Sequence, residues 1–348
     1  MQTYDLQRTW QWNLDHSPPP TDATPQAALP GTWAWCGLTV SSPLGIPAGP
    51  LLNSGWLLHY ANFGFDVLVY KTVRSTQRLC YPLPNLVPVT SNQLSTAGTV
   101  VPVSTAMQGS WAVSFGMPSQ TPDAWRKDVE FAQTRLAAGK VLVVSVVGTQ
   151  DENITDDQAS LEHLADDFAL CAEWALQSGA DGVEANFSCP NVSTADGQLF
   201  QQPESAGVVA ERIRDRIGTA PLVLKIGRVG SLTEAETLLQ HVGPHVNGLA
   251  MTNSIAARVT DTGGQLLFDG QPRGICGAAT RDASVSQIAM FKKALASSQH
   301  CLDLIGVGGI STADHVRDYL AAGASSVALA TAAMVDPTVG LAIRQQLM

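Results

Sequence analysis

The stretch LIGVGGISTADHVRDYLAAGASSVALATAAM, residues 304–334, decides the fold class of this chain of 348 residues. A short apolar run opens it, an amphipathic segment follows, and a second short apolar run comes near its end. Both runs are continuous rather than alternating with polar residues, which is typical of parallel strands that are buried on both faces. The stretch therefore predicts a strand–helix–strand unit.

Runs of the same kind recur along the chain from residue 39 onward. They are LGIPA (44–48), VLVYK (67–71), VLVVSVV (141–147), GVEANF (182–187), PLVLKI (221–226), GLAMTN (248–253), DLIGVGG (303–309) and SVALATA (326–332). Amphipathic segments such as 123–139 and 160–180 separate most of them. Eight strands that alternate with helices predict an α/β protein with a closed (β/α)₈ TIM barrel, and an open doubly wound sheet is the structural alternative. A Rossmann fold is disfavoured because no G-x-G-x-x-G follows the first run.

Three segments do not fit the barrel repeat. Residues 1–38 are rich in proline, threonine and tryptophan, and they predict an irregular N-terminal extension ahead of a barrel of residues 39–348. The tryptophans of this extension are expected to pack on the barrel or on a partner subunit. The connections 74–122 and 254–280 are longer than a barrel needs, and both follow strands. They are therefore expected to form functional loops on the C-terminal, catalytic face.

The composition excludes several classes of protein. Hydrophobic residues make up 45% of the chain and charged residues 14%, which suits a large core and argues against disorder. A net charge of −10 without a basic run disfavours nucleic acid and anionic membranes as partners. Six cysteines without a C-x-x-C pair make a metal site improbable, and no apolar run is long enough to span a membrane. We expect a cytoplasmic protein with free thiols.

The last two strands carry the signal for a bound phosphate. Gly308 and Gly309 end the seventh strand, and Ala330 and Thr331 end the eighth. Loops at these positions of a barrel commonly hold a phosphate with backbone N–H groups, and glycine lets the backbone approach the anion. Flavin, nucleotide and sugar-phosphate barrels all fit this signal.

The sequence EANFSCPN, residues 184–191, places polar groups at the end of the fourth strand. Asn186 and Asn191 offer both donors and acceptors, which suits an imide or amide ring. Cys189 lies between them with Ser188 beside it, and a thiol there can take a proton from a carbon acid if its thiolate is stabilised. An inert, buried thiol is the alternative, and it fits this position less well.

Two lysines, Lys71 and Lys225, end other strands of the predicted barrel. Desolvating an ammonium group is costly, so a charge inside a barrel indicates a purpose. A cation at the pyrimidine edge of a flavin would stabilise the reduced ring. A structural ion pair with Glu184 and a Schiff-base lysine of a lyase or aldolase are the alternatives.

These motifs resemble the dihydroorotate dehydrogenases, specifically the soluble class 1 type, from about residue 40 to the C-terminus. The pyrimidine domain of dihydropyrimidine dehydrogenase is a related form. NFSCPN is specific to that group. The resemblance implies that Cys189 is the active-site base, with Lys71 and Ser188 in the catalytic group. It further implies that the pyrimidine is held by Asn186, Asn191, Asn253 and Ser254.

The resemblance also implies FMN as the cofactor. The residues that it assigns to FMN are Ala48, Gly49, Lys71, Thr72, Ser145, Asn186, Lys225, Gly274, Gly277, Gly308, Gly309, Ala330 and Thr331. Cys189 would remove a proton from C5 of dihydroorotate while a hydride passes from C6 to the flavin. The reduced cofactor would then pass its electrons to a soluble acceptor such as fumarate, with ping-pong kinetics. A homodimer and a role in pyrimidine biosynthesis are implied in the same way.

Three positions depart from the family pattern. Val113 stands where an asparagine that holds the pyrimidine is usual, Asn85 replaces a common arginine, and Ala330 replaces a common glycine. A valine cannot replace the hydrogen bonds of an amide, and losing one in a buried polar site costs about 1–3 kcal/mol. A flavin oxidoreductase that acts on another dihydropyrimidine-like substrate therefore stays an alternative, as does a non-catalytic interaction protein.

Overall fold

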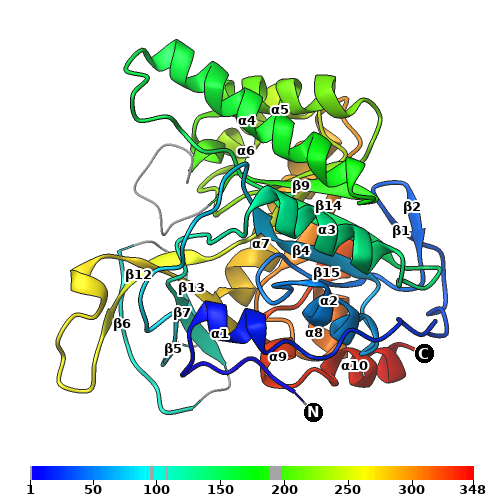
Figure 1. Ribbon diagram of the computed structural model, residues 1–348, viewed down its shortest axis with the longest axis vertical. Coiled ribbons are helices and arrows are strands. Elements are labelled where there is room, and N and C mark those ends of the chain that lie inside the picture. Colours follow the sequence, from blue (N-terminus) through cyan, green and yellow to red (C-terminus); the bar gives the residue numbers. More distant parts are fainter. Residues whose placement is uncertain (1, 92, 95–97, 107–108, 189–197) are drawn as a thin grey trace.

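Figure 1 shows the chain as a computed structural model, which describes residues 2–91, 93–94, 98–106, 109–188 and 198–348. Within these residues, eight parallel strands close into a barrel. In order around it they are β3 (Leu44–Ile46), β4 (Val67–Val73), β8 (Val141–Val146), β9 (Gly182–Asn186), β10 (Leu222–Lys225), β11 (Gly248–Met251), β14 (Asp303–Val307) and β15 (Ser326–Ala328). Each strand lies within or overlaps one of the eight apolar runs. The predicted TIM barrel is confirmed, and the open-sheet alternative is wrong.

Helices connect successive barrel strands and cover the outside of the barrel (Figure 1). They are α2 (Ser54–Ala61), α3 (Pro122–Gln133), α4 (Asp157–Gln177), α5 (Pro203–Ile217), α6 (Leu232–Val242), α7 (Arg281–Ala296) and α8 (Ala313–Ala322), with α9 (Thr331–Val335) and α10 (Val339–Leu347) after the last strand. Short 3₁₀ helices are η2 (Leu199–Gln201), η3 (Phe268–Gly270) and η4 (Ala278–Thr280). Strand side chains alternate in direction, so Leu142 and Val144 of β8 pack in the large core cluster with helix residues. Val141 and Val143 belong to the smaller cluster inside the barrel.

The amino-terminal end of the barrel is closed by a tryptophan. Strands β1 (Trp33–Trp35) and β2 (Leu38–Val40) form an antiparallel hairpin. Trp35 is 2% exposed and packs among the interior valines of the barrel. Gly182 at the start of β9 permits this packing, because a Cβ there would lie 2.8 Å from the Trp35 ring.

The N-terminal extension is more ordered than predicted. Besides β1 it contains α1 (Trp10–Asp15), which is capped by the side chain of Thr9. Trp10 is buried like Trp35, so these tryptophans pack on the rest of the chain. The hairpin of β1 and β2 spans residue 38, and the division of the chain at 38/39 stays a prediction.

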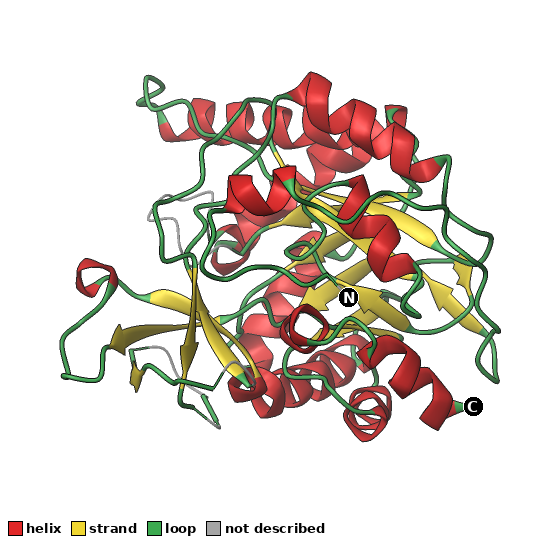
Figure 2. Cartoon of the chain, turned by 60° about the horizontal axis from the view of Figure 1, so that its bottom comes forward, coloured by secondary structure: helices red, strands yellow, loops and turns green. Residues whose placement is uncertain are grey.

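The two long connections fold together into a second sheet, here called the accessory sheet. Its strands, in spatial order, are β5 (Leu86–Val89), β7 (Ser110–Val113), β13 (Arg273–Gly277), β12 (Ile255–Thr260) and β6 (Val100–Pro102). Figure 2 shows it standing beside the barrel. β7 comes from the first connection and pairs antiparallel with β13 from the second. The segments predicted as loops therefore contain the five strands of a sheet, and both leave the C-terminal ends of barrel strands as expected.

Candidate active site

A cavity of about 410 Å³ lies between the C-terminal ends of the barrel strands and the accessory sheet. Of the residues predicted to form a site, it is lined by Ala48, Gly49, Lys71, Thr72, Asn186, Lys225, Asn253, Ser254, Gly277, Gly308, Gly309, Ala330 and Thr331. These residues come from strands that are far apart in the sequence. Parallel strands of a closed barrel all end on the same face, which is why the fold brings them together.

The barrel interior changes from apolar to polar toward the cavity. Val67 and Val69 of β4 belong to the interior cluster, and Lys71 follows two residues later. Val223 of β10 belongs to the same cluster, and Lys225 again follows two residues later. Since side chains alternate along a strand, both lysines continue the inward-facing row. They are buried, at 8% and 4% exposure, and both line the cavity.

Two asparagine side chains hold the backbone at the end of β9. The Oδ1 of Asn186 accepts a hydrogen bond from the backbone N–H of Ser188 at 3.1 Å. The Nδ2 of Asn253 donates a hydrogen bond to the backbone carbonyl oxygen of Ser188. Ser188 thereby fixes the start of the segment that carries Cys189 and Asn191, and these two predicted site residues lie outside the described part of the chain.

The glycines at the ends of β14 and β15 fit a phosphate-binding loop. Gly308 and Gly309 have φ of 136° and 66°, conformations that favour glycine. A Cβ on Gly309 would lie 2.7 Å from the Cβ of Arg281, so no side chain fits there. α9 begins at Thr331, and its first N–H groups have no acceptor within the helix. Gly49 has no atom within 4 Å of where its Cβ would be, which leaves its backbone open on the cavity side. This backbone cradle, with two lysines nearby, suits the phosphate and ring of FMN.

Three predicted site residues do not line the cavity. Ser145 is fully buried and its Oγ lies 3.0 Å from the Oγ1 of Thr72, so it supports a lining residue from behind. Gly274 lies in β13, where it pairs with Val113. Ser188 is buried and acts through its backbone, as described above.

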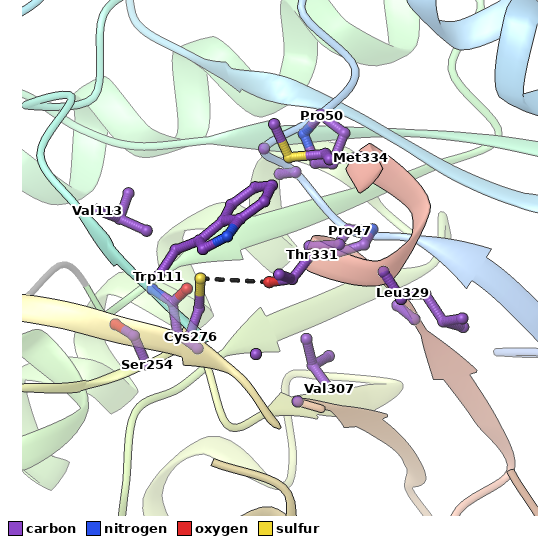
Figure 3. A pocket seen from close by; sticks show the side chains of 18 of the residues that line it. Pro47, Pro50, Trp111, Val113, Ser254, Cys276, Val307, Leu329, Thr331 and Met334 are labelled. Carbon is purple, nitrogen blue, oxygen red and sulfur yellow. Dashed lines mark hydrogen bonds between the residues drawn. The ribbon is translucent and has the colours of Figure 1, made fainter. Parts of the chain in front are cut away.

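The accessory sheet gives the cavity an apolar wall. Trp111 and Val113 of β7 line it (Figure 3), and Phe115 and Met117 line it as well. The Nδ2 of Asn186 even contacts the sulfur of Met117, at 3.6 Å. Asn85 does not reach the cavity; its amide donates to the carbonyl oxygens of Tyr81, Pro82 and Ser114 and closes the turn before β5.

Some lining residues were not predicted from the sequence. Tyr4 and Trp10 reach the cavity from the N-terminal extension, and no motif marks them. Cys276 lies in β13 with its Sγ 3.5 Å from the Oγ1 of Thr331 (Figure 3). Burial raises the pKa of the Cys276 thiol, and the contact with Thr331 and the charge of Lys225 offset this only in part. The only hint in the sequence is the position of Cys276 between Gly274 and Gly277.

No group of three or more His, Cys, Asp or Glu side chains among the described residues is arranged to hold a metal ion. In the same part of the chain, no helix is both long enough and apolar enough to cross a membrane.

A closed barrel with a cavity at the C-terminal ends of its strands has the architecture of a TIM-barrel enzyme. Residues 32–348 match the family model for dihydroorotate dehydrogenase. A dihydroorotate dehydrogenase of Dictyostelium discoideum is 31% identical, over 97% of this chain and 95% of that protein. The chain belongs to the dihydroorotate dehydrogenase family.

Two further comparisons agree. The catalytic subunit of dihydroorotate dehydrogenase B (NAD(+)) from Bacillus cereus is 24% identical over 89% of this chain and 88% of that protein. The crystal structure of the Eimeria tenella dihydroorotate dehydrogenase in complex with ferulenol has a TM-score of 0.69 at 18% identity, over 91% of this chain and 83% of that one. The protein is thus an oxidoreductase that acts on CH–CH groups, in a family that depends on flavin. This decides against the Schiff-base lyase and against a non-catalytic protein.

Proposed function

We propose that the protein oxidises dihydroorotate to orotate, with FMN as the cofactor and Cys189 as the base. The observation that carries the proposal is that the glycine cradle and four polar side chains line the same cavity. These four side chains, here called the polar floor, are those of Lys71, Lys225, Asn186 and Asn253. Family membership supports the same reaction.

The cavity residues divide between two parts of FMN. Gly308, Gly309 and Thr331 would hold the phosphate through backbone N–H groups. Ala48, Gly49 and Thr72 would lie against the ring, and Ser145 would orient Thr72. When bound there, FMN supplies the hydride acceptor. The ammonium groups of Lys225 and Lys71 favour negative charge at the polar floor, which stabilises the reduced form.

The substrate would lie against the asparagines of the floor. Asn186 and Asn253 have amide groups at the cavity, and Ser254 adds a hydroxyl. Asn191 would complete the set by resemblance. Cys189 would take the proton from C5 of the substrate, since it follows Ser188, whose backbone both asparagines hold. The two hydrogen bonds that hold the backbone of Ser188 are the contribution of the described residues to the proton transfer.

One observation favours a second candidate of the same class. Val113 lines the cavity, as do Phe115 and Met117, so this wall of the cavity is apolar. A dihydropyrimidine with an apolar or unsubstituted edge on this side fits that wall better than a charged one. An FMN-dependent dehydrogenase of such a substrate is therefore the alternative.

The remaining predictions concern the partners. A soluble electron acceptor such as fumarate and a homodimer follow from the resemblance to class 1 enzymes, and a cytoplasmic location follows from the cysteine usage of the sequence. They belong to this proposal as further predictions.

The deciding experiment is an absorbance spectrum of the purified protein before and after anaerobic addition of dihydroorotate. We expect a flavin spectrum that bleaches, and we expect Cys189→Ala to keep the flavin but bleach far more slowly. Cys301→Ala changes an exposed thiol and is the matched control. A flavin that bleaches with dihydrouracil but not with dihydroorotate would select the alternative. Failure to bind FMN even after reconstitution would overturn both.

A further inference from the structure

Glu184 is a carboxylate inside the barrel that the proposed reaction does not use. It lies in β9, where it pairs with Ser145 of β8 and Val223 of β10. Its neighbours Val183 and Ala185 pack in the core cluster outside the barrel, so Glu184 faces inward, two residues before Asn186. It is 3% exposed, and its Oε1 has no hydrogen-bond partner within the described residues.

An isolated carboxylate in such a place is costly. Moving an ionised carboxylate out of water without compensation costs several kcal/mol, so buried charges are normally paired. The interior cluster below Glu184 consists of apolar side chains, which offer no compensation. The compensating charges must therefore come from the C-terminal ends of the strands, where the cavity lies.

Two cations lie in that direction. Val223 of β10 is the strand partner of Glu184. Lys225 comes two residues after Val223 and faces the same interior. From strand spacing and rise, the Cα atoms of Glu184 and Lys225 are about 8 Å apart, which their long side chains can bridge. The buried Lys71 ends the inward row of β4. One anion and two cations thus face the same barrel interior.

We propose that Glu184 is a positioning residue that offsets part of the charge of Lys71 and Lys225 and thereby sets how strongly the site prefers reduced over oxidised FMN. The inference rests on the proposed function, because it requires FMN in the cavity. The polar floor carries a net positive charge when two cations face one anion, and it carries more when the anion is removed. In a buried site such charges act on each other with little screening.

The test is the ratio of the affinities for reduced and oxidised FMN, obtained from the midpoint potential of the bound flavin. Glu184→Gln removes the charge and keeps the shape, and we expect it to shift this ratio toward reduced FMN by about tenfold. Lys225→Met should shift the ratio the other way. The double variant should return it toward the wild-type value, which a merely structural role would not do.

Asp166→Asn removes the same charge from an exposed position on α4 and should leave the ratio unchanged. If Glu184→Gln does not fold, Glu184→Asp keeps the charge and should keep the ratio, and Lys225→Met still tests the direction. If the wild-type protein binds FMN and dihydroorotate bleaches that flavin, an unchanged affinity ratio in Glu184→Gln would overturn this inference alone. A wild-type protein that does not bind FMN would overturn the proposed function and this inference together.

Discussion

The Sγ of Cys276 lies 3.5 Å from the Oγ1 of Thr331, and this contact joins β13 of the accessory sheet to the first residue of α9. The proposed phosphate loop is thus held partly by a segment from another sheet. Cys276→Ala removes the contact, and a neutral hydrogen bond contributes about 0.5–1.5 kcal/mol. We expect the Kd for FMN to rise roughly 2- to 12-fold by titration of the apoprotein, and Cys276→Ser to restore most of the affinity. Equal Kd values for Ala and Ser variants would show that the contact does not support the loop.

Gly49 and Gly309 provide a matched pair of glycine substitutions. A side chain at Gly49 meets nothing within 4 Å and enters the cavity. Gly49→Val should leave the stability of the apoprotein within about 0.5 kcal/mol and abolish FMN retention. Gly309→Val places a side chain at φ 66° against Arg281, so it should lower the melting temperature as well. Normal FMN retention in Gly49→Val would place the cofactor elsewhere.

A buried ion-pair network ties the C-terminal helix to the barrel. The Oδ1 of Asp66 lies 2.8 Å from the Nζ of Lys140, and its Oδ2 lies 2.6 Å from the Nη1 of Arg344. Asp66→Asn leaves two buried cations without a counter-charge, and removing one partner of a buried pair costs about 3–5 kcal/mol. Urea unfolding should show that loss. Asp314→Asn, which breaks an exposed pair with Arg317, should cost at most about 1 kcal/mol. Similar costs for both would contradict the role of burial.

The barrel could be predicted because each of its strands is buried on both faces. Burial forces a continuous apolar run, as in 141–147, and a polar residue at the end of such a run then marks the cavity face. Lys71, Lys225 and Asn186 were found by this rule. Ser145 was assigned by resemblance and lies inside its run; it does not line the cavity, and its Oγ lies 3.0 Å from the Oγ1 of Thr72, which does.

The accessory sheet could not be predicted because its pairing is not local. Four barrel strands, β8 to β11, separate β7 from β13 in the sequence, and a strand such as β6 has only Val101 buried. Such short strands leave no periodic signal. Tyr4 and Trp10 were missed for a related reason. Their place at the cavity depends on the path of an extension whose local sequence does not specify where it packs.

His59 should make stability depend on pH. Burial holds the pKa of His59 below its ordinary value of 6.5, and the imidazole packs against Trp56 and Phe63. The unfolded chain therefore binds a proton more tightly, so the folded state loses stability as pH falls below 6.5. Melting temperatures between pH 7.5 and 5 should show a shallower loss in His59→Gln than in the wild type. His163→Gln, at an exposed position on α4, is the control. An unchanged slope in His59→Gln would exclude this contribution.

Substitutions of Val113 test which substrate this wall of the cavity accepts. Its side chain points toward the cavity from β7, and the strand is held by its backbone pairing with β5 and β13 (Figure 3). Val113→Asn can therefore add an amide at this wall without breaking the sheet. If dihydroorotate is the substrate, one added hydrogen bond of about 0.5–1.5 kcal/mol should raise kcat/KM for it roughly 2- to 12-fold.

Val113→Ala separates this effect from a change in volume, because it enlarges the cavity without adding a donor or acceptor. We expect it to leave kcat/KM for dihydroorotate unchanged or lower, as measured by anaerobic flavin bleaching at several substrate concentrations. A gain with dihydroorotate in the Asn variant, together with a loss for a dihydropyrimidine that lacks the carboxylate, would assign the specificity to this wall. Equal rates in the Ala and Asn variants for both substrates would instead place the specificity on the asparagine floor, where Asn186 and Asn253 hold the backbone of Ser188.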